Sequence, residues 1–312
     1  MSDIAGLVAG GRPRARAAMQ VVRFARMCVA EARPVVQIVF LMRFVTGLLF
    51  QVVALQRRPG IPIDPVHLLL GPIAWTLAVL AVYLVNGVMD VAEDRANGSS
   101  RPIASGALPL RAAATVVVLL AVLALAFGAA VPGLDWCVAG MLLLGHLYSG
   151  PPLPAKRTTL TAAATVVGMG LLTYLGGALS AGGSVTTGLL VFGGAMSAWM
   201  GCVGAVSKDL GDIPGDAVGG RRTLAVVHGE RAARRTTAVG ALAVGAAALG
   251  ASALWAPLCL AGTVPLAAGA VWVALRCRRP DVGRAPYRAF MITQYAAHAS
   301  MIAALLARLL FG

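Results

Sequence analysis

Charged residues are scarce in this sequence. Of its 312 residues only 12% are charged, whereas 59% are hydrophobic. A soluble globular protein carries about a quarter charged residues, because its surface must face water. The composition therefore excludes a water-soluble globule of this size and indicates a membrane protein, as does the mean hydropathy of +0.82.

Acidic residues are scarcer still, at 12 against 26 Lys and Arg. In a soluble protein the net charge of +14 would suggest nucleic-acid binding. Here, however, the arginines occupy short gaps between long apolar runs, which is typical of membrane topology with positive charge held beside anionic headgroups. We therefore expect membrane lipid as a partner and no nucleic acid.

The five cysteines form no metal-binding pattern. They are scattered, odd in number and mostly inside apolar runs, without a CxxC or Cys/His spacing. Disulfides and zinc are therefore not predicted.

The apolar residues are gathered into nine long runs. A helix needs about 20 apolar residues to cross a bilayer core of about 30 Å. The break at Trp255-Ala256-Pro257 divides the stretch 236–275 into two runs. The nine runs cover residues 35–55, 66–86, 111–131, 134–150, 159–180, 185–206, 236–252, 254–275 and 289–311. The sequence thus predicts an all-α, polytopic membrane protein of about nine transmembrane helices, with an Arg-rich N-terminal segment at 1–33 and a single transmembrane domain at 34–312.

The loops between these runs indicate the orientation of the chain. With the N-terminus in the cytoplasm, nearly all basic residues fall in cytoplasmic segments, and the outside loops hold only Arg57 and Arg58. We therefore expect a multi-pass protein of the inner cell membrane, with its C-terminus outside. Two cytoplasmic connections, 87–110 and 207–235, are long, and long connections are usually functional or disordered.

Half of the acidic residues lie in two short stretches of these connections. In the first, Asn86, Asp90 and Asp94 are four residues apart, so they share one face of a helix that continues out of the membrane. Carboxylates on one stripe repel each other unless a cation lies between them. Hard oxygen ligands suit Mg²⁺, which usually completes its shell with substrate phosphate.

The second stretch repeats the first. Asp209, Asp212 and Asp216 again share a helical face, although a Pro-Gly pair is expected to interrupt the helix and to leave Asp216 on a turn. Aligning Asp90 with Asp212 also aligns Asp94 with Asp216, which indicates an internal repeat. Two facing clusters of this kind could hold two metal ions around one diphosphate.

Basic residues beside the clusters fit a phosphate site. The only two lysines are Lys156, in the third cytoplasmic loop, and Lys208, beside the second cluster. A lysine is a compact point charge, which suits a phosphate oxygen. Arg33 before the first run and Arg101 after the first cluster are further candidates, and we attribute the remaining arginines to topology.

These motifs resemble those of the UbiA superfamily of intramembrane prenyltransferases. The two signatures of that family, NxxxDxxxD and DxxDxxxD, are matched by Asn86, Asp90, Asp94, Asp209, Asp212 and Asp216. The segments 101–106 and 148–156 match the Arg-Pro-Ile-Ala-Ser-Gly and Tyr-Ser-x-Pro-Pro…Lys motifs. The second signature is closer to the homogentisate-prenyltransferase-like branch than to the 4-hydroxybenzoate branch. Gly87 departs from the family, since many members have an acidic or amide residue there.

The resemblance implies Mg²⁺-dependent transfer of a prenyl group from a prenyl diphosphate to a hydrophobic, aromatic acceptor within the membrane. Two Mg²⁺ ions would bridge the clusters and the diphosphate. The implied metal ligands are Asn86, Asp90, Asp94, Asp209, Asp212 and Asp216. The implied diphosphate ligands are Arg33, Arg101, Lys156 and Lys208. The implied catalytic residues are Asp90, Asp94, Asp209, Asp212, Lys156 and Tyr148, of which Tyr148 would stabilise the allylic cation or orient the acceptor.

Two other functions fit parts of the sequence. A UbiA-type terpene cyclase would use the same clusters but would need no acceptor, so product analysis without an acceptor separates it from a transferase. A transporter would place ionisable groups near mid-membrane. Here the acidic residues lie at the cytoplasmic boundary, and only Arg43 and Arg308 fall within the predicted spans.

Overall fold

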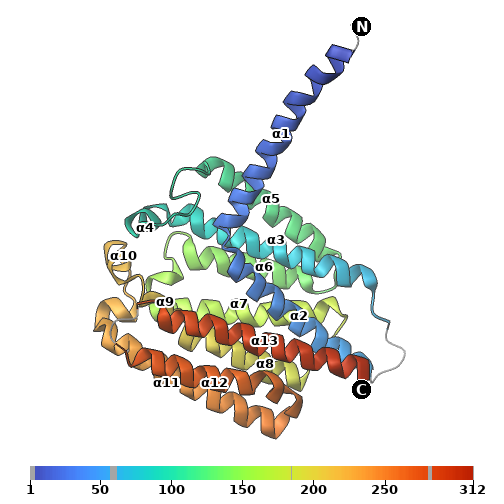
Figure 1. Cartoon of the computed structure of the whole chain (residues 1–312). Helices are drawn as coiled ribbons and strands as arrows, with labels where there is room; N and C mark the ends of the chain where they lie inside the picture. The colour runs from blue at the N-terminus through green and yellow to red at the C-terminus, as the bar shows by residue number, and fades with distance from the viewer. Residues whose placement is uncertain (1–3, 57–61, 184, 280–282, 312) are drawn as a thin grey trace.

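The computed structural model describes residues 4–56, 62–183, 185–279 and 283–311. Within these ranges the regular structure is helical, as predicted, and the long helices lie side by side in one bundle (Figure 1). Each predicted apolar run has its own helix. They are α2 (Pro34–Gln56), α3 (Pro65–Met89), α5 (Leu110–Ala129), α6 (Leu134–Ser149), α7 (Thr159–Ser180), α8 (Thr187–Trp199), α11 (Leu224–Trp255), α12 (Leu260–Cys277) and α13 (Ala285–Phe311).

Eight membrane-spanning candidates result from these helices in the described part of the chain. One of them combines α8, the π-helical turn η2 (Met200–Gly204) and α9 (Ala205–Asp209) in a single span. The helix left out is α6, whose 16 residues are about 24 Å long and thus shorter than a bilayer core of about 30 Å.

The helix ends follow from local sequence. The hydroxyls of Thr158, Thr186 and Thr223 each accept a hydrogen bond from the first turn of the helix that follows. The predicted break between the last two runs of the stretch 236–275 is confirmed, because Ala256 leaves the helical conformation (φ −152°, ψ 71°) and Pro257 begins the short helix η3 (Pro257–Cys259).

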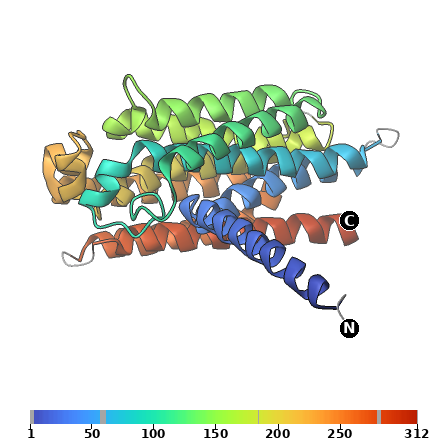
Figure 2. The same cartoon turned by 90° about the horizontal axis from the view of Figure 1, so that it is seen from above.

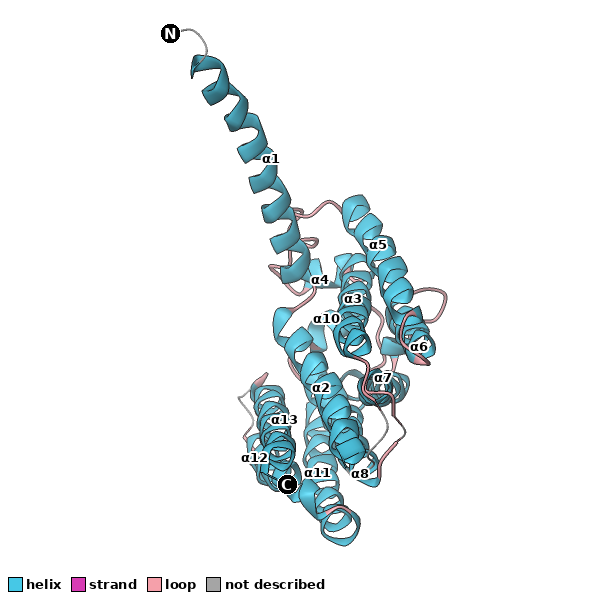
Figure 3. Cartoon of the chain, turned by 90° about the vertical axis from the view of Figure 1, so that its right-hand side faces the viewer, coloured by secondary structure: helices cyan, strands magenta, loops and turns pink. Residues whose placement is uncertain are grey.

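Contacts follow the chain around a closed ring. Each long helix packs on the next, and α13 packs back on α2. Across this ring α2 also packs on α7 (Figure 3). The two backbones come closest at glycines. A Cβ on Gly47 would overlap the carbonyl oxygen of Tyr174, and a Cβ on Gly177 would overlap that of Phe44. Only glycine permits so close a crossing.

The N-terminal segment forms α1 (Ile4–Glu31), which projects away from the bundle (Figure 1). It ends where Arg33 takes a left-handed conformation (φ 56°), and Pro34 then begins α2. The start of α2 and the end of α13 lie at opposite ends of the bundle (Figures 1 and 2), as expected when the nine long helices of the described ranges, α6 included, run alternately in opposite directions.

The two long connections contain short helices. The first holds α4 (Val91–Ala96), and the second holds α10 (Ile213–Val218). Helix α11 begins at Leu224, within the predicted second connection, but Gly229 (φ 81°, ψ 163°) interrupts it, so a short helical turn precedes the long part of α11. Both α4 and α10 lie at the end of the bundle where α2 begins, and they contact each other (Figures 1 and 2).

Candidate active site

The two Asp clusters have the same local structure. Asp90 precedes α4, and Asp212 precedes α10 in the same position. The backbone N–H of Asp94 donates to the carbonyl of Asp90 at 2.7 Å, and that of Asp216 donates to the carbonyl of Asp212 at 2.8 Å. Each pair of carboxylates is therefore carried on one short helical turn.

The two short helices also end alike. Gly98 and Gly220 both take the left-handed conformation, with φ of 63° and 67°. The N–H of the next residue then returns to the carbonyl of Asp94 at 2.8 Å or of Asp216 at 2.9 Å. The internal repeat that the sequence indicates is thus present in the structure.

One expectation for the second cluster is wrong. The Pro-Gly pair does not interrupt a helix after Asp212. Instead α9 ends at Asp209, and Pro214 lies in the first turn of α10, where the missing N–H costs nothing. Asp216 is therefore helical rather than on a turn, and the three aspartates do not share one continuous helical face.

Arg221 joins the two clusters through ion pairs. Its guanidinium lies 3.6 Å from Asp90 Oδ2 and 3.2 Å from Asp216 Oδ1, and it also pairs with Glu93. Lys156 pairs with Asp90 on the other side. The amide of Asn86 donates to Asp90 Oδ2 at 2.8 Å. Four of these side chains are nearly fully buried, namely Asp90, Lys156, Asp216 and Arg221.

A second group of contacts holds Asp94. Its Oδ2 lies 2.7 Å from Nη1 of Arg101, whose Nη2 lies 2.8 Å from Glu31 Oε1. Glu31 is fully buried at the end of α1, and its other oxygen accepts from the N–H of Ile103 at 2.8 Å. Gly87 leaves the space that this carboxylate occupies. Arg101, predicted as a diphosphate ligand, is thus engaged by two carboxylates.

Asp212 points elsewhere. Its carboxylate pairs with the exposed Arg284 at 2.6 Å. The structure therefore gathers Asp90 and Asp216 in one group of ion pairs and Asp94 in a second, with Asn86 in contact with both, while Asp212 pairs with the exposed Arg284.

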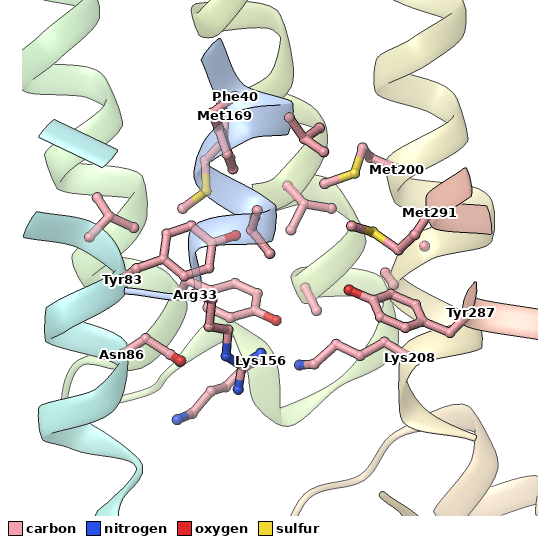
Figure 4. Close-up of a pocket in the computed structure, with 18 of the residues that line it drawn as sticks. Arg33, Phe40, Tyr83, Asn86, Lys156, Met169, Met200, Lys208, Tyr287 and Met291 are labelled. Carbon is pink, nitrogen blue, oxygen red and sulfur yellow. The ribbon is translucent and has the colours of Figure 1, made fainter. Parts of the chain in front are cut away.

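One pocket adjoins this group of ion pairs. Lys156 and Arg221 line it and also contact the Asp clusters. Figure 4 shows the charged ends of Arg33, Lys156 and Lys208 converging at one end of the pocket. Other predicted site residues that line it are Asn86, Tyr148 and Asp209.

Most side chains toward the opposite end of the pocket are apolar, although Arg43 and Gln294 also line its inner part. Phe40, Met169, Met200 and Met291 lie there, beyond the charged side chains (Figure 4). The pocket therefore fits an amphiphile with an anionic head and a hydrocarbon tail.

Burial changes the ionisation of groups at the charged end. Loss of water, together with the nearby charge of Arg221, lowers the pKa of the Lys156 ammonium to about 7. Burial also raises the pKa of Asp216 above the ordinary value of an aspartate. Both shifts follow from holding charges in a low-dielectric interior.

The donor set fits a hard cation. Asp216 Oδ2 is buried without a hydrogen-bond partner, so it is free to accept one more positive charge. In the described ranges no three Asp, Glu, His or Cys side chains stand close enough to hold a metal as they are. The reason is that the carboxylates are turned toward Lys156, Arg101, Arg221 and Arg284.

Sequence reasoning missed several residues of this site. It attributed Arg221 to topology, although this side chain follows the second cluster directly. Glu31 also escaped notice, although it is the only acidic residue between Asp3 and Asp64. Ser149, whose hydroxyl accepts from Asn86 at 3.0 Å, stood in the motif at 148–156 but was given no role of its own.

Comparison with known proteins agrees with this geometry. The UbiA prenyltransferase family matches residues 47–300. A digeranylgeranylglyceryl phosphate synthase of Halobacterium salinarum is 34% identical over 166 residues, which are 52% of this chain and 57% of that protein. The chain thus matches little more than half the length of this relative.

Solved structures share the fold. A UbiA homolog from Archaeoglobus fulgidus bound to DMAPP and Mg²⁺ superposes with a TM-score of 0.69 at 17% identity, covering 91% of this chain and 99% of that one. A UbiA homolog from the same organism bound to GPP and Mg²⁺ gives a TM-score of 0.65 at 19% identity, covering 90% of this chain and 99% of that one. From the family match, which covers most of the bundle, we conclude that this chain belongs to the UbiA prenyltransferase family.

Proposed function

We propose that this protein transfers a prenyl group from a prenyl diphosphate to a hydrophobic acceptor within the membrane, with Mg²⁺ as cofactor. The observation that carries the proposal is the two-ended pocket. Its charged end is tied to both Asp clusters through Lys156 and Arg221, and its other end is mostly apolar. DMAPP and GPP, named with Mg²⁺ for the Archaeoglobus homolog, support this class of donor.

The Asp clusters would hold the metal ions, which we expect to be two. When bound, Mg²⁺ supplies positive charge that stabilises the departing diphosphate. The proposed ligands are Asn86, Asp90, Asp94, Asp209, Asp212 and Asp216. Arg101 would act on Asp94, which it already contacts at 2.7 Å, and Asp212 would have to leave Arg284.

The cationic side chains would bind the diphosphate. Arg33, Lys156 and Lys208 converge at the charged end (Figure 4), and Arg221 lines the same pocket. Their charge favours breakage of the allylic C–O bond, because it stabilises the anion that leaves. The apolar end would hold the isoprenoid and keep water from the allylic cation.

The acceptor that we favour is aromatic. Tyr148, Tyr83, Tyr287 and Phe290 line the pocket, so an aromatic ring would find ring partners there. Tyr148 lines the same pocket as Asn86 and Ser149 and would stabilise the cation or orient the acceptor. The name of the Halobacterium relative supports a glyceryl lipid instead, so acceptors of both classes belong in the assay.

We further propose that the charged end of the pocket faces the cytoplasm of the inner membrane, with residues 34–312 as one transmembrane domain. The support is the positive-inside distribution of arginine.

The test is diphosphate release by the purified protein. Geranyl, farnesyl and geranylgeranyl diphosphates would be supplied with Mg²⁺ or EDTA, with and without an aromatic or glyceryl-lipid acceptor. Wild type would be compared with Asp90→Ala, Asp216→Ala and the control Asp135→Ala, which lies in the first turn of α6 at the other end of the bundle.

Mg²⁺-dependent release that is lost in both cluster variants and kept in the control supports the proposal. Dependence on the acceptor indicates a transferase, and release with a cyclised product in its absence indicates a terpene cyclase. Release from no donor, or release that both cluster variants retain, refutes it.

A further inference from the structure

The structure holds a positive charge deep inside the bundle, away from the Asp clusters. Arg43 lies in the middle of α2 and is fully buried. Arginine stays protonated in proteins. A charged side chain at membrane depth is costly and is retained where it has a function. No carboxylate pairs with Arg43 among the described residues, so its charge has no counter-ion within them.

Neutral groups hold the guanidinium in place. Its Nη2 donates to Gln294 Oε1 at 2.7 Å, and the group lies over the ring of Phe40, 5.3 Å from the centroid. The backbone oxygen of Gln294 is 2.6 Å from His298 Nδ1, and His298 Nε2 is 2.6 Å from the hydroxyl of Tyr174. If Nδ1 of His298 carries the proton, Tyr174 donates to Nε2, and this set of bonds contains no anion.

Two donors of this guanidinium make no well-formed hydrogen bond with the described residues, although the hydroxyl of Tyr174 lies within reach of the group. Nε and Nη1 of Arg43 are buried without a hydrogen-bond partner. A buried N–H without an acceptor costs free energy, and a charged one costs more. A ligand that brings an anionic oxygen would satisfy both the donors and the charge.

Arg43 lines the same pocket as Arg33, Lys156 and Lys208, whose charged ends form the charged end, or mouth, of the pocket. Side chains of a helix lean toward its N-terminus, so the guanidinium points back toward Arg33. Ten residues of rise, less one turn, place it about 10 Å deeper than Arg33. One turn beyond Arg43, Gly47 marks the close crossing of α2 and α7. Arg43 thus lies deeper in the pocket than Arg33.

We propose that Arg43, oriented by Gln294, binds an anionic oxygen of the acceptor substrate, either a carboxylate or a phosphate. This inference rests on the proposed prenyl transfer. The prenyl diphosphate does not suit the position beside Arg43, because its diphosphate already has cations at the mouth of the pocket and its tail is hydrocarbon. An allylic cation would be repelled there. The acceptor is the substrate left to supply the negative charge.

The experiment measures equilibrium binding of matched probes to the full-length protein in detergent. One pair is 4-hydroxybenzoate and the neutral 4-hydroxybenzyl alcohol. The other pair is 1-oleoylglycerol 3-phosphate and the neutral 1-oleoylglycerol. The first pair tests an aromatic carboxylate and the second a lipid phosphate. Mg²⁺ and the unreactive geranyl thiolodiphosphate fill the donor site, so that the probes do not bind at the mouth.

Three variants separate binding from structural support. Arg43→Met removes the charge. Gln294→Glu keeps the shape and the hydrogen bond but supplies an internal counter-ion, so a purely structural role of Arg43 is preserved or improved. Arg43→Lys keeps a charge and serves as the conservative variant.

We expect the wild type to bind at least one anionic probe about tenfold more tightly than its neutral partner. Arg43→Met and Gln294→Glu should lose this preference, and Arg43→Lys should keep part of it. Equal binding within both pairs by the wild type overturns the proposal. The proposal is also overturned if Gln294→Glu still prefers the anionic probe. This second result decides the matter even if Arg43→Met does not fold.

Failure of the proposed function gives a different result. If no prenyl diphosphate binds or ionises, the probes are measured without the analogue in a Lys156→Gln background, which weakens anion binding at the mouth. A preference for the anionic probe that depends on Arg43 then still supports an anion site at this residue. If no such preference is found, the anion site is overturned.

Discussion

Glu31 and Gly87 share one space: a Cβ on Gly87 would overlap the Oε1 atom of the Glu31 carboxylate. The two residues are far apart in the sequence and come from α1 and α3. The carboxylate in this space contacts Arg101, which in turn contacts Asp94 of the first cluster. The absence of a side chain at one position therefore permits a buried ion pair from another.

This relationship predicts reciprocal effects of substitution. Glu31→Gly should lower diphosphate release about 10- to 100-fold, because Arg101 loses a buried partner and Asp94 loses its support. Gly87→Asp alone should also lower it, because the new side chain collides with Glu31. The double variant should recover most of the activity, since the carboxylate introduced on α3 would replace the one removed from α1. Steady-state kinetics of the three variants would measure this, and additive losses in the double variant would contradict it.

Arg221 and its neighbour Arg222 offer a matched comparison. Arg221 is buried between Asp90 and Asp216, whereas Arg222 is exposed. We expect Arg221→Gln to lower kcat/KM for the prenyl diphosphate about 100-fold. Loss of one hydrogen-bond donor that stabilises a developing anion typically has an effect of this size. Arg222→Gln should stay within about twofold of wild type, as surface substitutions do. Equal effects of the two changes would remove Arg221 from the site.

Metal binding should stabilise the fold only when the buried carboxylates are intact. Inorganic diphosphate with Mg²⁺ should raise the unfolding temperature of wild type. The free energy of unfolding should increase by about 2.7 kcal/mol when the ligand is at 100 times its Kd. EDTA should abolish the gain. In Asp216→Asn, which loses one negative charge beside the unpartnered oxygen, the gain should shrink, while Asp135→Asn should behave as wild type. A full gain in Asp216→Asn would place the metal elsewhere.

The crossing of α2 and α7 predicts a stability difference between two glycines. Gly177→Ala should destabilise the protein by more than about 1 kcal/mol, because the new methyl group meets the backbone of Phe44 and the helices must separate. Gly194→Ala, with nothing within 4 Å of its Cβ, should be neutral or stabilising by about 0.5–1 kcal/mol. Thermal unfolding in detergent would compare them, and equal midpoints would show that the crossing tolerates a side chain.

Much of this arrangement could be predicted from local sequence. The apolar runs and the Pro257 break depend on neighbouring residues, and each has its counterpart in the structure. The single helix expected through Asn86, Asp90 and Asp94 is interrupted, because α3 ends at Met89 and α4 begins at Val91, with Asp90 between them. Lys156 and Lys208 could be placed at the pocket because they stood out in a chain whose other cations are arginines.

The remaining site residues depend on long-range folding. Arg221 looks like any arginine at a membrane boundary until α10 turns it back against Asp90. Glu31 reaches Arg101 from the last residue of α1, 70 positions away in the sequence, before the left-handed Arg33 leads into α2. The break after Asp209 could not be read from helical spacing, which is the same for one continuous helix and for two.

The repeat seen in α4 and α10 extends through most of the chain. Asp90 and Asp212 are 122 residues apart, and the same interval relates α2 to α7, α3 to α8 with α9, α5 to α11, and α6 to α12. This is the pattern that duplication and fusion of one four-helix ancestor produces, with α13 as the unpaired remainder. An ancestor with an even number of crossings enters and leaves on one side of the bilayer, so its two copies face the same way. A three- or five-helix ancestor would have left the two sets of aspartates on opposite sides of the membrane.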